Sequence, residues 1–321
     1  MSTVKMDPEW ALMWEAFKLM PKPVINDIYD VRRGANTALT ASNATLVVPE
    51  EVPETKHTIT SLDGTSIDVH RFVPAAAAAD PKTQRAILYA FGGGMVAGSI
   101  DVWRQGIKEL AYRTGSQVFA VHYRLAPEHP APAAVEDFYS AAKWLQENAT
   151  EFNVDPKRVI LYGPSAGGGI AAGTSLMIRD KGLPYPPAAL MLIYPMIDDR
   201  TVLPADHPVQ EFLIWTSKNN DLAWKAYLGR EREERTDENV PIYGAPARAK
   251  DLSGLPDTYI DVGGLDLFVN EDIEYARRLQ AAGVYVEFHL FPGVPHGFES
   301  ARHMRVAQDT ISARTKFLLR Y

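Results

Sequence analysis

The feature that most constrains the fold is the repeated alternation of short apolar segments with longer amphipathic ones. The apolar segments lie at residues 85–91, 117–125, 158–163, 188–195, 257–263 and 284–291. Between them apolar residues recur at helical spacing, as in 135–149 and 270–283. Continuously apolar strands that alternate with helices are typical of a parallel sheet covered on both faces. The sequence therefore predicts an α/β fold, preceded at residues 57–74 by a hairpin that turns at Asp63-Gly64. The alanine-rich stretch at residues 75–84 is predicted to be a loop.

Two regions, residues 1–45 and 197–239, interrupt this alternation. Residues 8–20 carry aromatic and methionine side chains at spacings of three and four, which predicts an amphipathic helix that packs through its aromatic face. The second region is predicted to contain two helices. We expect the α/β core to comprise residues 46–196 and 240–321, and the two interrupting regions to form a cap over the ends of the sheet.

Composition excludes several classes of function. The 321 residues carry a net charge of -7 and include no cysteine, which excludes a disulfide, a thiolate metal site and a cysteine nucleophile. No basic stretch points to a nucleic-acid partner, and no apolar stretch is long enough to span a membrane. Asp7 and Glu9 lie where a signal peptide would have its apolar core, so we expect a mature N-terminus and a cytoplasmic location.

The segment "VILYGPSAGGG" carries the clearest chemical signal. Gly163-Pro164-Ser165-Ala166-Gly167 fits G-x-S-x-G, and it lies between a predicted strand and a predicted helix. A serine hydroxyl is a weak nucleophile unless it is exposed, held and next to a base. A sharp turn from strand to helix presents it and tolerates only small neighbours. We therefore predict that Ser165 is a nucleophile; the alternative is a glycine-rich helix start that packs closely on a strand.

A second alternative for the glycine-rich segments is phosphate binding. Residues 92–97 and 167–172 both formally match G-x-G-x-x-A. A dinucleotide site also needs an acidic residue about 20 residues further on. The chain has "AVHYRL" and "PYPPA" at those places, and neither glycine segment contains G-K-[ST]. Phosphate binding is therefore disfavoured.

The three consecutive glycines in "YAFGGGMVAG" suit a different task. Attack on a carbonyl places negative charge on its oxygen, and backbone N–H groups must approach that oxygen to about 3 Å. Side chains would obstruct this approach, so bare glycine backbone is favoured. We predict that Gly93 and Gly94 form an oxyanion hole together with the N–H of Ala166, the residue after the nucleophile.

A base and an acid are placed to complete a catalytic triad. His296 in "FPGVPHGF" follows the last predicted strand, and Asp266 in "DVGGLDLFVNED" follows the strand before it. Both lie at carboxyl ends of strands, the active edge of an open parallel sheet, and the order Ser, Asp, His fits. The rival acids are less suitable, because Asp261 lies within a strand while Glu271 and Asp272 begin a helix, where acids favour the dipole.

These motifs, together with "HYRLAPEHPAPAAVEDFYSAAKWL", resemble those of the hormone-sensitive-lipase-type (family IV) esterases of the α/β-hydrolase superfamily over residues 87–298. The resemblance implies a mostly parallel eight-stranded sheet flanked by helices, a helical cap, and no metal or organic cofactor. It also implies that His296 acts first as base and then as acid, while Asp266 orients it. Two residues depart from the family pattern: Phe91 replaces a histidine before the three glycines, and Leu267 replaces a proline.

The sequence predicts a serine hydrolase that cleaves a carboxylic ester or a lactone, through an acyl-enzyme intermediate, with a role in secondary metabolism as one possibility. Trp14, Trp215 and Phe298 are expected to contact a small apolar or aromatic substrate. The alternative is a non-catalytic small-molecule receptor on the same scaffold. Such receptors usually lack the base, whereas His296 is present here. A second copy of the chain, in a homodimer, is a further candidate partner.

Overall fold

The structure is a computed structural model that describes residues 4–19 and 24–321. It contains one eight-stranded sheet with the order β1-β2-β4-β3-β5-β6-β7-β8. The strands are β1 (Glu54–Thr60), β2 (Ser66–Phe72), β3 (Gln84–Tyr89), β4 (Gln117–His122), β5 (Val154–Pro164), β6 (Ala189–Ile193), β7 (Thr258–Gly263) and β8 (Val286–Phe291). The pairs β1–β2 and β2–β4 are antiparallel, and all the others are parallel. The predicted α/β fold with a mostly parallel eight-stranded sheet is confirmed.

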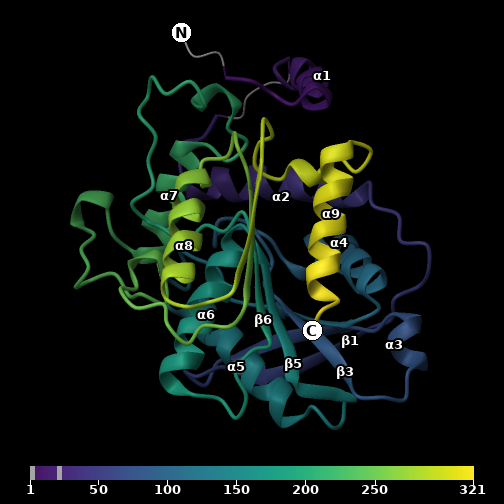
Figure 1. Ribbon diagram of the computed structural model, residues 1–321. Coiled ribbons are helices and arrows are strands. Elements are labelled where there is room, and N and C mark those ends of the chain that lie inside the picture. Colours follow the sequence, from purple (N-terminus) through teal and green to yellow (C-terminus); the bar gives the residue numbers. More distant parts are fainter. Residues whose placement is uncertain (1–3, 20–23) are drawn as a thin grey trace.

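Helices cover both faces of the sheet. Figure 1 shows α4 and α9 on one side of it and α5, α6 and α8 on the other. The helices are α1 (Pro8–Phe17), α2 (Ile28–Ala44), α3 (Ala75–Ala79), α4 (Ile100–Thr114), α5 (Ala133–Glu147), α6 (Ala166–Lys181), α7 (Ser217–Leu228), α8 (Val269–Ala281) and α9 (Arg305–Leu318). The alternating apolar segments become the buried strands β3 to β7, which explains why these strands read as continuous apolar runs.

The first predicted helix is present, and its aromatic face packs as expected. It is α1, which begins after Asp7, whose carboxylate accepts hydrogen bonds from the backbone N–H groups of the first turn. Trp10 and Trp14 are its buried side chains. The end of the helix predicted over 8–20 lies partly outside the described residues. The second helix of this region, α2, was not predicted from the sequence.

Two local predictions are wrong. The segment 197–239 contains one α-helix, α7, and two short 3-10 turns at Gln210–Phe212 and Arg232–Glu234, instead of two α-helices. The helix begins late because Thr216 caps it, with its hydroxyl accepting from Asn219 N at 3.1 Å. The alanine run 75–79, predicted as a loop, forms the short helix α3, in keeping with the high helix propensity of alanine.

The topology brings the predicted functional segments to one edge of the sheet. Strands β3, β5, β7 and β8 run parallel, so their carboxyl ends meet there. The glycine-rich segment follows β3, Ser165 follows β5, Asp266 follows β7 and His296 follows β8. Helices α1, α2 and α7 lie toward one end of the molecule in Figure 1, and α2 packs against both α4 and α7.

Candidate active site

Ser165 occupies a sharp turn between β5 and α6. Its backbone has φ 54° and ψ -123°, an unusual conformation for a residue with a side chain. Gly163 and Gly167 are required there, because a methyl group on either would lie 2.1 Å from neighbouring backbone. The Ser165 N–H donates to the Ile193 carbonyl at 2.8 Å, and its own carbonyl accepts from Gly168 N at 2.9 Å. The turn is therefore held on both sides of the residue whose hydroxyl it presents.

The structure brings Ser165, His296 and Asp266 into one hydrogen-bonded chain. His296 Nε2 lies 3.0 Å from Ser165 Oγ, and His296 Nδ1 lies 2.7 Å from Asp266 Oδ2. The other carboxylate oxygen of Asp266 accepts the N–H of Phe268 at 3.0 Å. Asp266 is fully buried, whereas Ser165 retains 9% of its surface. The distances suit proton transfer from the serine to the imidazole.

The two loops that carry Asp266 and His296 are joined by backbone hydrogen bonds. Gly264 N donates to the carbonyl of Phe291 at 2.7 Å, and Leu265 N donates to the carbonyl of Val294 at 3.0 Å. These bonds continue the pairing of β7 with β8 beyond the ends of the strands. Because each loop is tied to the other, the separation of the acid from the base is set by the sheet.

The imidazole of His296 is enclosed by two aromatic rings that sequence reasoning missed. The ring of Tyr194 lies 4.4 Å from it and the ring of Phe268 lies 5.4 Å from it, measured between centroids. Tyr194 directly follows β6 and has φ 34°, which is rare for a residue with a side chain. Its place at the carboxyl end of a central strand was the one signal in the sequence that favoured a role at this edge.

The hydroxyl of Tyr194 lies next to a network of charged side chains formed by Glu299, Arg314 and Asp261. Burial raises the pKa of Tyr194 well above its ordinary value, so its hydroxyl stays protonated and donates to Glu299. Burial alone would raise the pKa of Glu299, but Arg314 and the tyrosine hydroxyl outweigh it and hold that pKa below its ordinary value. Arg314 also makes two hydrogen bonds to Asp261, at 2.7 and 2.9 Å. Asp261, one of the rival acids, thus pairs with Arg314 and not with His296.

The other two rival acids have different surroundings. Glu271 accepts the N–H groups of Ile197 at 2.8 Å and Asp198 at 3.1 Å, and thereby fixes the chain as it leaves β6. Asp272 is fully buried, and neither of its carboxylate oxygens has a hydrogen-bond partner among the described residues. Burial, with Glu271 and Asp266 nearby, raises the pKa of Asp272 well above its ordinary value. Asp272 is therefore a buried acid beside the acid of the predicted triad, and its surroundings favour the protonated form.

The predicted oxyanion loop, which we call the glycine loop (residues 92–98), is held by its carbonyl groups. Trp103 Nε1 donates to the Gly92 carbonyl at 3.1 Å. Val96 N and Ala97 N donate to the Gly93 carbonyl at 3.2 and 2.9 Å. Each peptide group is planar, with its N–H opposite its C=O. The Gly92 carbonyl therefore fixes the direction of the Gly93 N–H, and the Gly93 carbonyl fixes that of the Gly94 N–H.

The third predicted donor, Ala166, is the first residue of α6. The N–H groups of the first helical turn have no acceptor within the helix, so the Ala166 N–H is suited to an oxygen bound next to Ser165. Gly92 adjoins this position, since a methyl group built on it would lie 3.4 Å from Ser165 Cβ. The glycine loop and the serine turn are thus neighbours.

Phe91, which departs from the family pattern, is fully buried. Its ring stacks on that of Tyr123 with 4.1 Å between centroids. The Tyr123 hydroxyl also donates to the Phe91 carbonyl at 2.7 Å. Packing and one hydrogen bond from a neighbouring strand end therefore hold the start of the glycine loop without a histidine.

The three residues expected to contact substrate lie in different surroundings. Trp215 lies against the glycine loop, since a methyl group built on Gly94 would be 2.4 Å from Trp215 Cη2. Trp14 is mostly buried between the rings of Phe17 and Phe212. Phe298 is fully buried in a cluster with Trp10 and Val294, which leaves it no open surface for a ligand.

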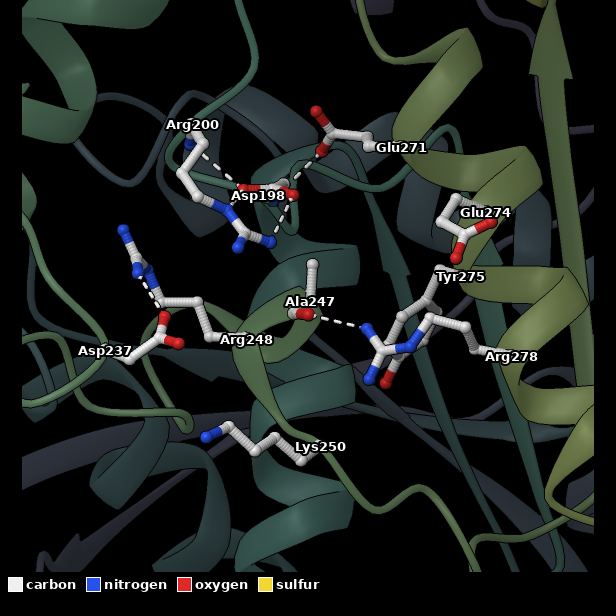
Figure 2. A pocket seen from close by; sticks show the side chains of 10 residues that line it. All are labelled: Asp198, Arg200, Asp237, Ala247, Arg248, Lys250, Glu271, Glu274, Tyr275 and Arg278. Atoms are coloured by element: carbon white, nitrogen blue, oxygen red, sulfur yellow. Dashed lines mark hydrogen bonds and ion pairs between the residues drawn. The ribbon is translucent and has the colours of Figure 1, made fainter.

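Two surface cavities have no lining residue from the predicted triad. Figure 2 shows one of about 310 Å³ beside α8, lined by charged side chains. There Arg248 pairs with Asp237 at 2.7 Å, and Arg278 donates to the Ala247 carbonyl at 2.6 Å. The other cavity, of about 740 Å³, lies between α7 and the segment that begins α2. Most of the charged side chains that line the first cavity make a hydrogen bond or an ion pair with a neighbouring residue in Figure 2. These contacts suit a structural role, in which the side chains hold the chain around α8.

Two further features of the described residues concern metals and membranes. Within residues 4–19 and 24–321, no group of three or more His, Cys, Asp or Glu side chains is arranged to hold a metal ion. Of the helices that the structure describes, none is both long enough and apolar enough to cross a bilayer.

Comparison with known proteins gives a consistent result. The model of a family described as having the alpha/beta hydrolase fold matches residues 87–300. The esterase LipI of Mycobacterium tuberculosis is 36% identical over 223 residues, covering 66% of this chain and 65% of the relative. The carboxylesterase NlhH of the same species is 35% identical over 223 residues, covering 66% of each protein. The match thus spans slightly less than two thirds of each of these relatives.

A solved structure is similar over nearly its whole length. Bacterial heroin esterase superposes with a TM-score of 0.85 at 33% identity, and the match covers 98% of both chains. The family match contains the glycine loop, Ser165, Asp266 and His296. Since it also covers more than half of the sequence, the chain belongs to the α/β-hydrolase fold family, in the hormone-sensitive-lipase-type group that its motifs resembled.

Proposed function

We propose that the protein is a serine esterase that hydrolyses carboxylic esters through an acyl-enzyme intermediate. The observation that carries the proposal is the continuous chain from Ser165 Oγ to His296 Nε2 at 3.0 Å and from His296 Nδ1 to Asp266 at 2.7 Å. A serine so connected has a base within reach, and the base has an orienting carboxylate. The names of the relatives, esterase and carboxylesterase, support the same reaction class.

The reaction begins with acylation of the serine. Ser165 Oγ forms a bond to the acyl carbon of the ester while its proton passes to His296 Nε2. The carbonyl oxygen becomes an oxyanion and accepts hydrogen bonds from the N–H groups of Gly93, Gly94 and Ala166. His296 then gives its proton to the alkoxy oxygen as the ester C–O bond breaks, and the alcohol leaves. Asp266 holds the imidazole in the required tautomer throughout.

Deacylation repeats these steps with water. A water molecule loses its proton to His296 Nε2 as its oxygen bonds to the acyl carbon, and the second oxyanion occupies the same hole. The bond from the acyl carbon to Ser165 Oγ breaks, and His296 returns the proton to Ser165. The products are a carboxylic acid and the free serine.

The segments 1–45 and 197–239 are proposed to form a cap over the site. Side chains of this cap are proposed to limit the size of the substrate. Trp215 from the second segment lies against Gly94, and its Nε1 donates to Asn220 Oδ1 at 3.2 Å, which fixes the indole. From this rigid indole beside the proposed oxyanion hole we infer that the acyl group of the substrate is short. The proposed substrate is a short-chain ester, or a lactone, of a small apolar or aromatic compound of the kind found in secondary metabolism.

Hydrolysis of p-nitrophenyl esters with acyl chains of two to sixteen carbons tests the proposal. Turnover of the short esters by wild type, with a loss of about 10⁴-fold or more in Ser165→Ala, is the expected result. A folded wild-type protein that releases no p-nitrophenol from any of these esters would contradict it, and would favour the small-molecule receptor instead.

A further inference from the structure

The helix α2 contacts the glycine loop through two side chains one helical turn apart. Arg32 Nε donates to the Val96 carbonyl at 2.6 Å. Asn36 Oδ1 accepts the Gly98 N–H at 2.8 Å. Residues four apart lie on the same face of a helix, so α2 presents one donor and one acceptor to adjacent parts of a single loop.

Arg32 is itself held in place by further contacts. Its guanidinium donates to the Ala126 carbonyl at 2.7 Å and to both carboxylate oxygens of Glu128, at 2.8 and 2.6 Å. The Ala126 N–H in turn donates to the Met95 carbonyl at 3.0 Å. A bidentate pair of arginine with carboxylate has a fixed geometry. Arg32 therefore joins the glycine loop to the segment after β4 as one rigid unit.

The part of the loop that α2 holds is the part that orients an oxyanion donor. The N–H groups of Val96 and Ala97 donate to the Gly93 carbonyl. That carbonyl belongs to the same planar peptide group as the Gly94 N–H. A shift of the turn at residues 96–98 would therefore rotate the Gly94 N–H away from the oxyanion.

The two residues lie outside the part of the chain that the family model matches, which begins at residue 87. The family motifs therefore give no role to Arg32 or Asn36, and their contacts with residues more than 60 positions away are visible only in the fold.

We propose that Arg32 and Asn36 are positioning residues that hold the Gly94 N–H in the oxyanion hole. They act through Val96 and Gly98 and do not touch the substrate. The proposal rests on the serine esterase function proposed above. In this proposal α2 both covers the active site and contributes to catalysis. If the helix loosens, the Gly94 N–H moves and the oxyanion is stabilised less.

The test compares three variants with a control on the same helix. Arg32→Lys keeps the positive charge beside Glu128 but removes the guanidinium fork, and Asn36→Ala removes the acceptor for Gly98 N. Asn36→Asp keeps an oxygen at that place. The control is Arg33→Lys, since Arg33 is exposed and its ion pair is with Asp30 in the same helix.

Active sites are first counted by reaction with a serine-directed phosphonate, so that kcat refers to folded, competent enzyme. We expect kcat to fall about tenfold in Arg32→Lys and Asn36→Ala, with KM changed less than about twofold, because a small displacement of a catalytic donor has effects of this order or larger. The affinity for a trifluoromethyl ketone, which forms a tetrahedral adduct with the serine, should fall by the same factor. Asn36→Asp should recover most of the loss, and Arg33→Lys should match wild type.

Equal kcat per titrated site in wild type, Arg32→Lys and Asn36→Ala would overturn the proposal, and so would a loss in Asn36→Asp as large as that in Asn36→Ala. A fall in the number of titrated sites alone, with kcat unchanged, would likewise assign the two residues to stability only. A wild-type protein that does not react with the phosphonate at all would remove the esterase function, and with it this role, before any variant is compared.

Discussion

The aromatic ring of Tyr194 packs against the imidazole of His296, with 4.4 Å between the ring centroids. Its hydroxyl points the other way, toward Glu299. Tyr194 thus connects the proposed catalytic base to Glu299. Glu299 in turn pairs with Arg314, which forms the buried ion pair with Asp261. Ring and hydroxyl have separate roles, and substitutions can distinguish them.

Tyr194→Phe should keep most of the activity but lower stability. The ring remains against His296, while the partly buried Glu299 loses a donor, which costs about 1–3 kcal/mol for a hydrogen bond to a charged group. Tyr194→Leu should also lower kcat about tenfold, because the imidazole loses its packing. Urea unfolding and esterase kinetics measure both effects. Tyr139→Phe is the control, since that hydroxyl donates to a neutral carbonyl, of Gly182; a similar loss of stability in both variants would contradict the role of the charge.

Trp103→Phe should lower kcat by about tenfold or more with little change in KM. The substitution removes part of the indole together with the Nε1–H that holds the Gly92 carbonyl. It thereby frees the peptide that carries the Gly93 N–H, a donor of the kind whose loss costs about 10²–10³ in kcat. The measurement is kcat per titrated serine. Trp144→Phe is the matched control, because Trp144 lies in an aromatic cluster with Phe119 and Phe152. An identical kcat per titrated serine in Trp103→Phe and wild type would show that the glycine loop keeps its conformation without the Trp103 hydrogen bond.

Asp272→Asn should stabilise the protein near neutral pH. An acid whose pKa is raised in the folded state weakens folding once the pH exceeds its unfolded value, because the unfolded chain then loses a proton that the folded chain keeps. The burial that raises the pKa of Asp272 thus predicts no gain below about pH 4, and above it a gain that grows by up to about 1.4 kcal/mol per pH unit until the folded group ionises.

The measurement for Asp272 is the free energy of unfolding in urea at several pH values for wild type and Asp272→Asn. Asp309→Asn serves as the control, since Asp309 is exposed on α9. A difference between wild type and Asp272→Asn that stays constant from pH 4 to pH 8 would contradict a raised pKa of this buried acid.

Much of the fold and site follows from local sequence patterns, for identifiable reasons. Strands buried on both faces must be apolar along their length, so β3 to β7 could be located directly. Ser165, Asp266 and His296 could be predicted because each follows a strand at the one edge where carboxyl ends meet. The hairpin was predictable because Asp63-Gly64 suits a tight turn. These features depend on short stretches of chain.

The contacts that hold the site in place join residues far apart in the sequence. Arg32 contacts Val96 across 64 positions, and Tyr194 contacts Glu299 across 105 positions. No periodicity or motif in the sequence predicts either contact. The prediction for segment 197–239 was wrong for a related reason. The aromatic residues of this segment pack against other segments, and only the stretch after the Thr216 cap forms an α-helix. Tertiary packing outweighs local propensity in such segments.

Trp215→Ala should shift the chain-length preference toward longer acyl groups. The indole that lies against Gly94 would be replaced by a small side chain, opening space beside the proposed oxyanion hole. The ratio of kcat/KM for p-nitrophenyl octanoate to that for p-nitrophenyl acetate should rise about tenfold or more, since each methylene accommodated in an apolar pocket is worth about 1 kcal/mol or more. Trp14→Ala, farther along the proposed cap, should change the ratio less. An unchanged ratio in Trp215→Ala would place the acyl pocket elsewhere.

The most direct test of the central claim is covalent labelling of Ser165. Intact-mass spectrometry after reaction with a fluorophosphonate should show one adduct per chain in the wild-type protein, and peptide mapping should place it on Ser165. Ser165→Ala should remain unlabelled while keeping its fold by circular dichroism, and His296→Ala should react about 10³-fold or more slowly, because a triad serine without its base is a poor nucleophile. No adduct on folded wild-type protein, or an adduct on another residue, would contradict the proposal that Ser165 is the nucleophile of an esterase.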